Sequence, residues 1–493
     1  MKIERRFTRE GQDPYKGIRW EERISEIKDS EGKIIFRQEG VTVPSSWSQI
    51  ATDILAQKYF RKTGVPKEIS SLEGETDARQ VFHRLGFTWR KWGERFGYFD
   101  TPRDAEAFYD EIVRMLADQM AAPNSPQWFN TGLYEVYGIE GPPQGHYYVD
   151  PESGEVRKSE SAYQRPQPHA CFILDVEDDL VNPGGIMDLI NREARLFKYG
   201  SGTGSNFSKI RGEGEPLSGG GISSGLLSFL KIADRSAAAI KSGGTTRRAA
   251  KMVILDIDHP DIESYILWKV QEEHKVASLV AGSALIRSRL ENLRTTIGEF
   301  YRSKADGKTE TDPSMIKTVQ DAITTAIQEG IPAGFIHQYI RLLDQGIVLP
   351  DPPLYTTDWT EEAYNTVSGQ ASNNSVRISD RFMRAVLEDE DWELKARTTG
   401  AVVKRVKARY LWDLITRSAW QCADPGLQFH TTVNEWHTCP EDGEIRASNP
   451  CSEYMFLDDT ACNLASLNLR AFYDTETGTF RIEDYLHAIR LWT

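Results

Sequence analysis

The chain of 493 residues contains little cysteine, no excess of positive charge and no long hydrophobic segment. Its five cysteines are odd in number and include no Cys-x-x-Cys pair, which excludes a secreted disulfide framework and a tetrathiolate zinc site. The longest apolar run, Val276 to Ile286, is far shorter than the roughly 20 residues of a membrane span, and Met1-Lys-Ile-Glu-Arg-Arg lacks a signal-peptide core. We therefore expect a cytoplasmic protein with mostly reduced thiols and no membrane segment.

Acidic residues outnumber basic ones: 59 Lys and Arg against 73 Asp and Glu give a net charge of −14. This balance repels polyphosphate backbones, so general nucleic-acid binding is disfavoured. Hydrophobic residues make up 39% of the chain, and 38 glycines bring the apolar share into the globular range. The length suits about three domains, or one large barrel with additions.

The pattern of apolar residues divides the chain into regions. Residues 1–120 predict an N-terminal helical cap, because charged residues separate apolar ones at helical spacing. Residues 121–493 alternate helical stretches with short β-rich runs such as Cys171-Phe-Ile-Leu-Asp-Val and Met252-Val-Ile-Leu-Asp-Ile, which favours parallel strands joined by crossover helices. Residues 287–375 are charged and helical, then rich in Pro, Asp and Thr, and we interpret them as an insertion that carries no chemistry.

The segment from Ile482 to Thr493 predicts an amphipathic helix with Ile482, Leu486, Ile489 and Trp492 on one face. It stops without Gly, Pro or another cap. We therefore expect a further polypeptide that continues this helix.

Two glycine-rich segments are candidate binding loops. Tyr199-Gly-Ser-Gly-Thr-Gly-Ser-Asn206 lacks the Gly-Lys-Ser/Thr of a P-loop, and Ser205 occupies the place of the third glycine in a dinucleotide fingerprint. A close-packed turn and a ligand loop suit it equally. Lys241-Ser-Gly-Gly-Thr-Thr-Arg-Arg248 puts cationic side chains beside open backbone, which suits phosphate contact, with a solvated basic turn as the alternative.

Asn449-Pro-Cys-Ser-Glu453 is the strongest candidate for a reactive site. In an extended loop, Asn449, Cys451 and Glu453 lie on one face, and Pro450 biases Asn449 toward extended geometry. An amide, a thiol and a carboxylate then point toward one small target. For so short a match, a buried free cysteine beside a Ser-Glu cap is the alternative.

The remaining thiols, Cys422 and Cys439, could join His430 or His437 in a metal site. Their spacing fits no standard zinc pattern. We expect structural or incidental thiols there, and no metal ligands.

Taken together, several motifs closely resemble the catalytic chain of ribonucleotide reductase, and most of all the adenosylcobalamin-dependent class II branch. The resemblance runs from about residue 120 to residue 470. The matching segments follow the order of that family: Asn124-Ser-Pro-Gln-Trp-Phe-Asn130, His169-Ala-Cys171, Tyr199 to Asn206, Lys241 to Lys251 followed by Asp258-His-Pro, and Asn449 to Glu453 with Cys462 eleven residues after Cys451.

The resemblance implies an α/β fold, a ten-stranded α/β barrel of two five-stranded parallel halves. This chain would hold the first half and a finger loop at residues 445–465, with the remainder of the barrel absent. The implied catalytic residues are Cys451 for the thiyl radical, Glu453 as general base, Asn449 for the substrate hydroxyls, and Cys171 with Cys462 as the reducing pair. Substrate contacts are implied for Ser125, Ala170, Gly202 and Asn449, and effector contacts for Asp178, Lys241, Arg247 and Arg248.

The residue types agree with this chemistry. Hydroxide is a poor leaving group from the ribose 2′ carbon, and removing hydrogen from C3′ activates that neighbour. A cysteine S–H bond is close enough in strength to the C3′–H bond for reversible exchange. A carboxylate can take the 3′-OH proton, and a thiol pair can supply electrons while it closes a disulfide. The radical needs a cofactor, for which the resemblance implies adenosylcobalamin.

The resemblance also implies several partners: a ribonucleotide substrate, a deoxynucleotide or ATP effector, a thioredoxin-like reductant, a homodimer of the complete chain, and a complementary C-terminal polypeptide that completes the barrel. Two alternatives stay open. One is a class I-type large subunit that uses a separate radical-generating metal subunit. The other is a non-catalytic half that needs a complementary chain. The sequence does not distinguish diphosphate from triphosphate substrates.

Overall fold

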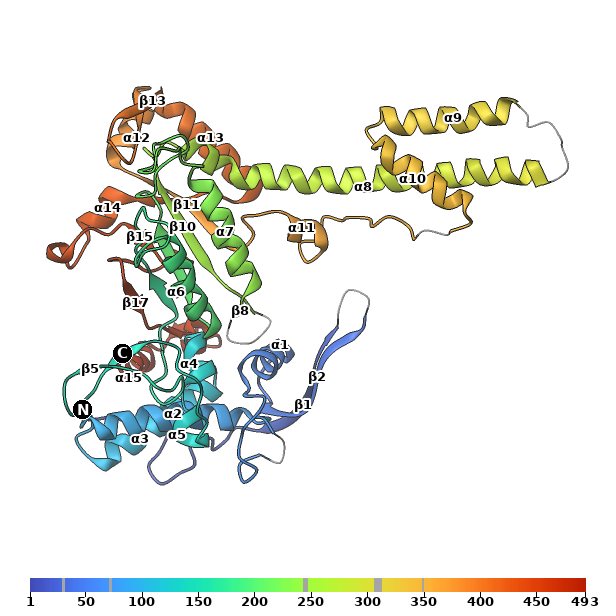
Figure 1. The fold of residues 1–493 in the computed structure, drawn as a ribbon. Coiled ribbons are helices and arrows are strands. Elements are labelled where there is room, and N and C mark those ends of the chain that lie inside the picture. The colour runs from blue at the N-terminus through green and yellow to red at the C-terminus, as the bar shows by residue number, and fades with distance from the viewer. Residues whose placement is uncertain (29–31, 71–72, 243–246, 306–312, 348–349) are drawn as a thin grey trace. The chain divides into compact units, whose positions relative to one another are not determined.

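The computed structural model describes residues 1–28, 32–70, 73–242, 247–305, 313–347 and 350–493 (Figure 1). These residues form two compact units. The first contains Met1–Ile262, Ala371–Trp412 and Pro425–Thr493, and the second contains Glu263–Gln370 and Asp413–Asp424. All of the candidate catalytic residues belong to the first unit. No helix among the described residues is long and apolar enough to cross a membrane.

The N-terminal part of the first unit contains a β hairpin as well as helices. β1 (Trp20–Lys28) pairs antiparallel with β2 (Ile34–Pro44), so the prediction of a purely helical cap was wrong for this segment. The strands were missed because Ile24, Ile34 and Ile35 are exposed among charged residues, which leaves no alternating buried pattern to read.

The helices of this part are defined by their caps. α2 (Ala78–Arg95) begins at Asp77, where Gln80 completes a capping box, and α3 (Pro102–Ala117) begins at Thr101 with proline in its first turn. Phe82 and Leu85 of α2 pack in one core with Ile112 and Val113 of α3. The other helices here are α1 (Gln49–Ile54), a π-helical turn (Leu55–Tyr59), α4 (Ser125–Asn130) and α5 (Leu133–Tyr137).

A six-stranded sheet with the order β14-β11-β10-β7-β6-β17 forms the centre of the first unit. Five strands are parallel, as predicted, and β17 runs antiparallel to its neighbour β6. The described strands form an open sheet, and the ten-stranded barrel stays a prediction. The strands are β6 (Cys171–Ile173), β7 (Gly202–Asn206), β10 (Lys251–Asp256), β11 (Ser372–Ile378), β14 (Gly426–Phe429) and β17 (Thr460–Cys462).

Helices connect the parallel strands, as expected for crossover connections. α6 (Ile186–Lys198) joins β6 to β7, α7 (Leu226–Ala239) joins β7 to β10, and both lie beside the sheet in Figure 1. Glu193 of α6 forms a buried ion pair with Lys251 of β10 and accepts a hydrogen bond from Thr203 of β7. Helix α6 therefore covers the face of the sheet that carries Thr203 and Lys251, which we call the outer face. Between β11 and β14 lie α12 (Asp380–Leu387) and α13 (Ala408–Cys422).

The opposite, inner face of the sheet receives the finger, a hairpin of β15 (Ala447–Ser448) and β16 (Met455–Phe456). Its apolar side chains pack on Ile173, Met252 and Ile254 of the sheet. A Cβ on Gly204 would lie 1.8 Å from the Ser448 carbonyl oxygen, and one on Gly202 would lie 2.7 Å from Cγ of Pro450. Gly202 and Gly204 therefore lie in a strand that packs closely against the finger, whereas a role of this segment in ligand binding stays a prediction.

The second unit is helical. α8 (Ile262–Ala305), 44 residues long, packs its Leu290 and Leu293 with residues of α9 (Pro313–Gln328) and α10 (Ala333–Asp344), and α11 (Glu362–Thr366) follows. The insertion predicted at 287–375 has other bounds than this compact unit and stays a prediction. Helix α8 starts at Ile262, next to the boundary of the unit at Glu263, and is unbroken at residue 287, and β11 begins at Ser372.

The predicted C-terminal helix is confirmed as α15 (Ile482–Trp492), and Trp492 of its predicted apolar face packs against two core clusters, whereas the first residues of that face are exposed. Ile482 and Leu486 are 60% and 38% exposed, whereas His487 and Ala488 are buried. The helix is rotated because Nε2 of His487 lies 2.9 Å from the Glu111 carboxylate of α3.

The remaining elements are short. They comprise the antiparallel pairs β3 (Ala121–Pro123) with β18 (Ala465–Leu467), β4 (Tyr147–Val149) with β5 (Val156–Lys158), β8 (Lys241–Ser242) with β9 (Arg247–Arg248), β12 (Asp391–Lys395) with β13 (Val402–Lys407) and β19 (Tyr473–Asp474) with β20 (Thr479–Phe480), the helix α14 (His430–Glu435), and 3-10 turns at Pro440–Asp442 and Leu469–Phe472.

Candidate active site

Cys171 of β6 and Cys462 of β17 lie directly opposite each other on neighbouring antiparallel strands. Opposed residues in such a pair have Cα atoms about 4.5–5.5 Å apart, inside the roughly 4.4–6.8 Å that a disulfide spans. Both cysteines are free thiols and 8% exposed. The pair can therefore close a disulfide without movement of the backbone.

The two thiols are not equivalent. Their mutual hydrogen bond, together with burial, raises the pKa of Cys171, and the same hydrogen bond lowers the pKa of Cys462. Cys462 is therefore the thiol of the pair that ionises first, and the Cys171 thiol donates to Glu453 Oε1 (4.0 Å). The nearby carboxylate of Glu453 opposes ionisation of either thiol.

The tip of the finger is a tight turn, so the expected extended loop was wrong. Ser452 N donates to the Asn449 carbonyl oxygen (3.2 Å), with Pro450 second and Cys451 third in the turn. Cys451 keeps a negative φ, as a type I turn requires, whereas Ser452 has a φ of 62°. The turn presents the exposed thiol of Cys451 at its corner.

The residues flanking this turn nevertheless converge on the thiol pair. The Asn449 side chain accepts from Tyr454 N (3.0 Å), which orients its amide so that Nδ2 donates to Cys171 Sγ (3.1 Å). Glu453 Oε1 lies 4.0 Å from the same sulfur. The structure therefore brings Cys171, Cys462, Asn449 and Glu453 together.

Two amide side chains of the sheet, which were not predicted, hold the finger tip. Asn373 Nδ2 of β11 donates to the Pro450 carbonyl oxygen (2.7 Å), and Gln428 Nε2 of β14 donates to Ser448 Oγ (2.7 Å) and reaches Ser452 Oγ at 3.4 Å. A possible signal was the polar run Ser372-Asn-Asn-Ser in a strand of a parallel sheet, where hydrophobic runs are the rule.

The other residues implied for substrate contact lie at the same end of the sheet. Ala170 N donates to the Cys462 carbonyl oxygen (3.1 Å), and the Ala170 carbonyl oxygen accepts from Gly202 N (2.7 Å). Asn124, the neighbour of Ser125, connects this segment to the same end of the sheet. Its Nδ2 donates to the side chain of Asn463 (2.7 Å), the residue after Cys462. All three positions therefore connect to the strand ends that carry the thiol pair.

The implied effector residues come from two other segments of the chain, at residue 178 and at residues 241–248. Asp178 forms an ion pair with Arg211, whose Nε lies 2.7 Å from its carboxylate. Lys241, Arg247 and Arg248 belong to the paired strands β8 and β9, and their side chains and residues 243–246 lie outside the described part of the structure.

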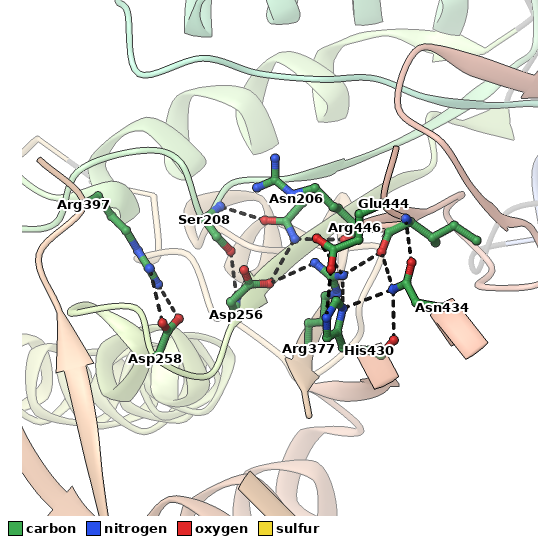
Figure 2. Close-up of polar contacts among 11 residues, drawn as sticks. Asn206, Ser208, Asp256, Asp258, Arg377, Arg397, His430, Asn434, Glu444 and Arg446 are labelled. Carbon is green, nitrogen blue, oxygen red and sulfur yellow. Dashed lines mark hydrogen bonds and ion pairs between the residues drawn. The ribbon is translucent and has the colours of Figure 1, made fainter. Parts of the chain in front are cut away.

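A polar network lies at the carboxyl ends of the parallel strands, beside a cavity of about 700 Å³ (Figure 2). Arg377 of β11 is buried among His430, Asp256 and Glu444, and it donates to the Ile445 carbonyl oxygen (2.6 Å). Burial, followed by the charge of Arg377, lowers the pKa of His430. Since Ile445 lies just before β15, this network fastens the base of the finger.

No group of three or more His, Cys, Asp or Glu side chains within the described ranges is arranged to hold a metal ion. The Cys422 thiol donates to carbonyl oxygens of Ser418 (3.3 Å) and Asp424 (3.4 Å). His437 bonds to the Gly443 carbonyl oxygen (3.1 Å). These contacts serve the local backbone.

A parallel sheet with a finger hairpin against its inner face, and a thiol pair at its edge, is the architecture that the motifs predict. Residues 169–493 match the family model described as the barrel domain of ribonucleotide reductase, and the chain belongs to this family. Residues 21–119 match the model described as class II vitamin B12-dependent ribonucleotide reductase, which confirms the predicted branch.

Curated relatives agree with this assignment. The chain is 56% identical to the vitamin B12-dependent ribonucleotide reductase of Agrobacterium fabrum and 55% identical to that of Bradyrhizobium diazoefficiens, with all of this chain and 41% of each relative aligned. It is 27% identical to the vitamin B12-dependent ribonucleoside-diphosphate reductase of Thermoplasma acidophilum, over 90% of this chain and 43% of the relative. The chain thus spans about two fifths of the length of these relatives.

Proposed function

We propose that this chain supplies the reacting cysteines of an adenosylcobalamin-dependent enzyme that reduces ribonucleotides to 2′-deoxyribonucleotides. The observation that carries the proposal is the convergence of the finger on the thiol pair. Asn449 contacts Cys171, Cys171 faces Cys462, and Cys451 stands exposed at the corner of the same turn.

The proposed roles follow from the surroundings of each group. As a thiyl radical, Cys451 takes the hydrogen atom from C3′ and returns it at the end of turnover. Glu453 accepts the 3′-OH proton, and the Asn449 amide, which bonds to sulfur here, holds the ribose hydroxyls. The 2′ C–O bond is replaced by C–H, the hydroxyl leaves as water, and the two thiols are oxidised to one disulfide.

Because the two thiols differ in pKa, we assign them different roles in proton transfer. Cys171 keeps its proton, so we assign to it the protonation of the departing 2′-hydroxyl. Cys462 is the more acidic thiol and supplies the thiolate that closes the disulfide. A thioredoxin-like dithiol then reopens the disulfide by exchange.

The residues present suit adenosylcobalamin. When bound, this cofactor supplies a carbon radical that can take hydrogen from a thiol. Cys451 fits that role because it is exposed on a turn anchored at both ends, while the reducing thiols are buried. The match to the class II model favours this cofactor over the class I alternative with its separate metal subunit.

Binding of an effector nucleotide by Asp178, Lys241, Arg247 and Arg248 is part of the proposal. So are a homodimer and the polypeptide that completes the ten-stranded barrel. Asp178 is engaged by Arg211, so an effector that contacts Asp178 must share or displace this ion pair.

The decisive experiment combines this chain with a polypeptide that contains the remaining barrel strands, adenosylcobalamin, a ribonucleotide and a dithiol without oxygen. We expect deoxynucleotide in repeated turnovers. Cys451→Ala abolishes product formation, whereas Cys439→Ala, at a half-buried thiol without a proposed role, retains it. Turnover by Cys451→Ala overturns the radical assignment, and nucleotide binding without turnover by the complemented wild-type protein supports the non-catalytic alternative.

A further inference from the structure

The finger is bonded to the sheet at its base and at its tip. Side chains alternate between the two faces of a strand, so residues four apart lie on the same face and can contact the finger at both places. Asn373 and Arg377, four residues apart on β11, both reach the finger, and Gln428 does so from the neighbouring strand β14. At the base, Arg377 donates to the Ile445 carbonyl oxygen. Asn206 donates to the carbonyl oxygen of Arg446 (2.9 Å), and Figure 2 shows these two residues side by side. At the tip, Asn373 and Gln428 hold the turn itself.

The tip needs external support because its backbone is unfavourable. Ser452 has a φ of 62°, a left-handed conformation that is unfavourable for residues other than glycine. Its hydroxyl is 3.2 Å from Ser448 Oγ and 3.4 Å from Gln428 Nε2. The bonds from the sheet therefore oppose relaxation of the strained residue that follows Cys451.

These bonds flank the reactive thiol on both sides. Asn373 holds the carbonyl of Pro450, which belongs to the peptide bond that precedes Cys451. Gln428 holds Ser448 and Ser452, the residues before and after the turn's corner. We propose that Asn373 and Gln428 are positioning residues for Cys451, which fix the direction of its thiol without touching the reacting atoms themselves.

The chain offers a matched control for Asn373. Its neighbour Asn374 is 3% exposed, and its side chain accepts from the Ser372 hydroxyl (3.1 Å) without contacting the finger. Asn373→Asp removes the amide donor and places a carboxylate against the Pro450 carbonyl, whereas Asn374→Asp makes the same chemical change on the other face of β11.

The first test is hydrogen exchange of the 493-residue chain. The amides of Ser452 and Tyr454 report on the turn, because both donate to Asn449. We expect Asn373→Asp and Gln428→Leu to speed their exchange by about 5- to 10-fold, the equivalent of one hydrogen bond. Asn374→Asp should leave it unchanged. Equal exchange in wild type and both tip variants, or equal acceleration by Asn374→Asp, overturns the proposal.

The second test measures turnover in the complemented enzyme, and this consequence alone depends on the proposed function. Asn373→Asp should lower kcat by about 100-fold, as expected when a reacting group is displaced by about 1 Å, with KM for the ribonucleotide unchanged. An unchanged kcat overturns the positioning role even if exchange is faster. Absence of turnover in the wild type instead counts against the proposed function, while the exchange result stands. Asn373 is exposed, so we expect the Asn373→Asp variant to fold. Both tests can then be carried out with this variant alone if Gln428→Leu does not fold.

Discussion

Two cysteines on adjacent strands acquire different chemistry from their neighbours. Cys171 accepts a hydrogen bond from the Asn449 amide and donates one to Glu453 Oε1, and its pKa is raised whereas that of Cys462 is lowered. Both cysteines could be identified in the sequence. The difference between their pKa values could not, because it depends on the residues that the fold places beside each thiol.

Loss of Cys171 should make Cys462 harder to ionise. The hydrogen bond from Cys171 lowers the pKa of Cys462, so Cys171→Ala moves that pKa upward. The pH at which Cys462 reacts half-maximally with iodoacetamide should therefore rise, as followed by mass spectrometry of its peptide. Asn449→Ala tests specificity, since it removes a donor to Cys171 and leaves the Cys171–Cys462 bond in place. An unchanged or lower midpoint in Cys171→Ala contradicts the assigned direction.

Mild oxidation of the chain should produce one intramolecular disulfide, between Cys171 and Cys462. Their opposed positions on β6 and β17 already satisfy the geometry of the bond. Peptide mapping after treatment with an oxidised dithiol identifies the linkage, and Cys171→Ser should abolish it without creating another. A bridge from Cys451 to either thiol as the main product would show that the finger departs from the described turn.

Glycine at position 204 is required by the finger. An alanine there would place Cβ 1.8 Å from the Ser448 carbonyl oxygen, so Gly204→Ala must displace β15 or the sheet. We expect a loss of about 3 kcal/mol or more in unfolding free energy, at or above the upper end of ordinary overpacking. Gly219→Ala, at a loop glycine with open space and no positive φ, is the control. Denaturant midpoints of the two variants measure the difference.

Elements with strong local signals were predictable, and those set by distant contacts were not. The runs at Cys171 and Met252 gave parallel strands because buried strands are rich in β-branched and apolar residues. The hairpin β1–β2 gave no such signal, since its isoleucines face solvent. At the finger, the expected extended geometry was wrong, because Asn373 and Gln428 hold a turn from strands far away in the sequence.

Across the whole first unit, one carboxylate joins three distant parts of the chain. Glu111 of α3 accepts from Phe7 N and Thr8 N near the N-terminus, and from His487 of α15. Burial raises its pKa, but the bonds from His487, Thr8 and Phe7 outweigh burial and bring the pKa below the usual value of glutamate. These contacts explain why α15 turns His487 rather than Ile482 inward.

The lowered pKa fixes the sign of a pH dependence. Glu111 stabilises the fold fully above the ordinary glutamate pKa, and this contribution disappears as pH falls through its lower folded pKa. Glu111→Gln should therefore cost about 1–3 kcal/mol at pH 7 and flatten the loss of stability on acidification below about pH 4. Urea unfolding at pH 7, 4 and 3 checks this, with the exposed Glu106→Gln on the same helix as control. Parallel pH curves for both variants would refute it.

Strand β7 has a consequence for how the protein folds. Gly202 and Gly204 contribute no side chain to the inner face, so the sheet lacks its own filling there until Ser448 and Pro450 of the finger settle against the bare backbone. The finger residues Ser448 and Pro450 follow Gly204 and Gly202 by 244 and 248 residues in the chain, and they form the core that covers this strand. Completion of the sheet and formation of the turn that carries Cys451 therefore depend on the same docking step, and a chain whose finger has not docked has neither a finished core nor a formed turn.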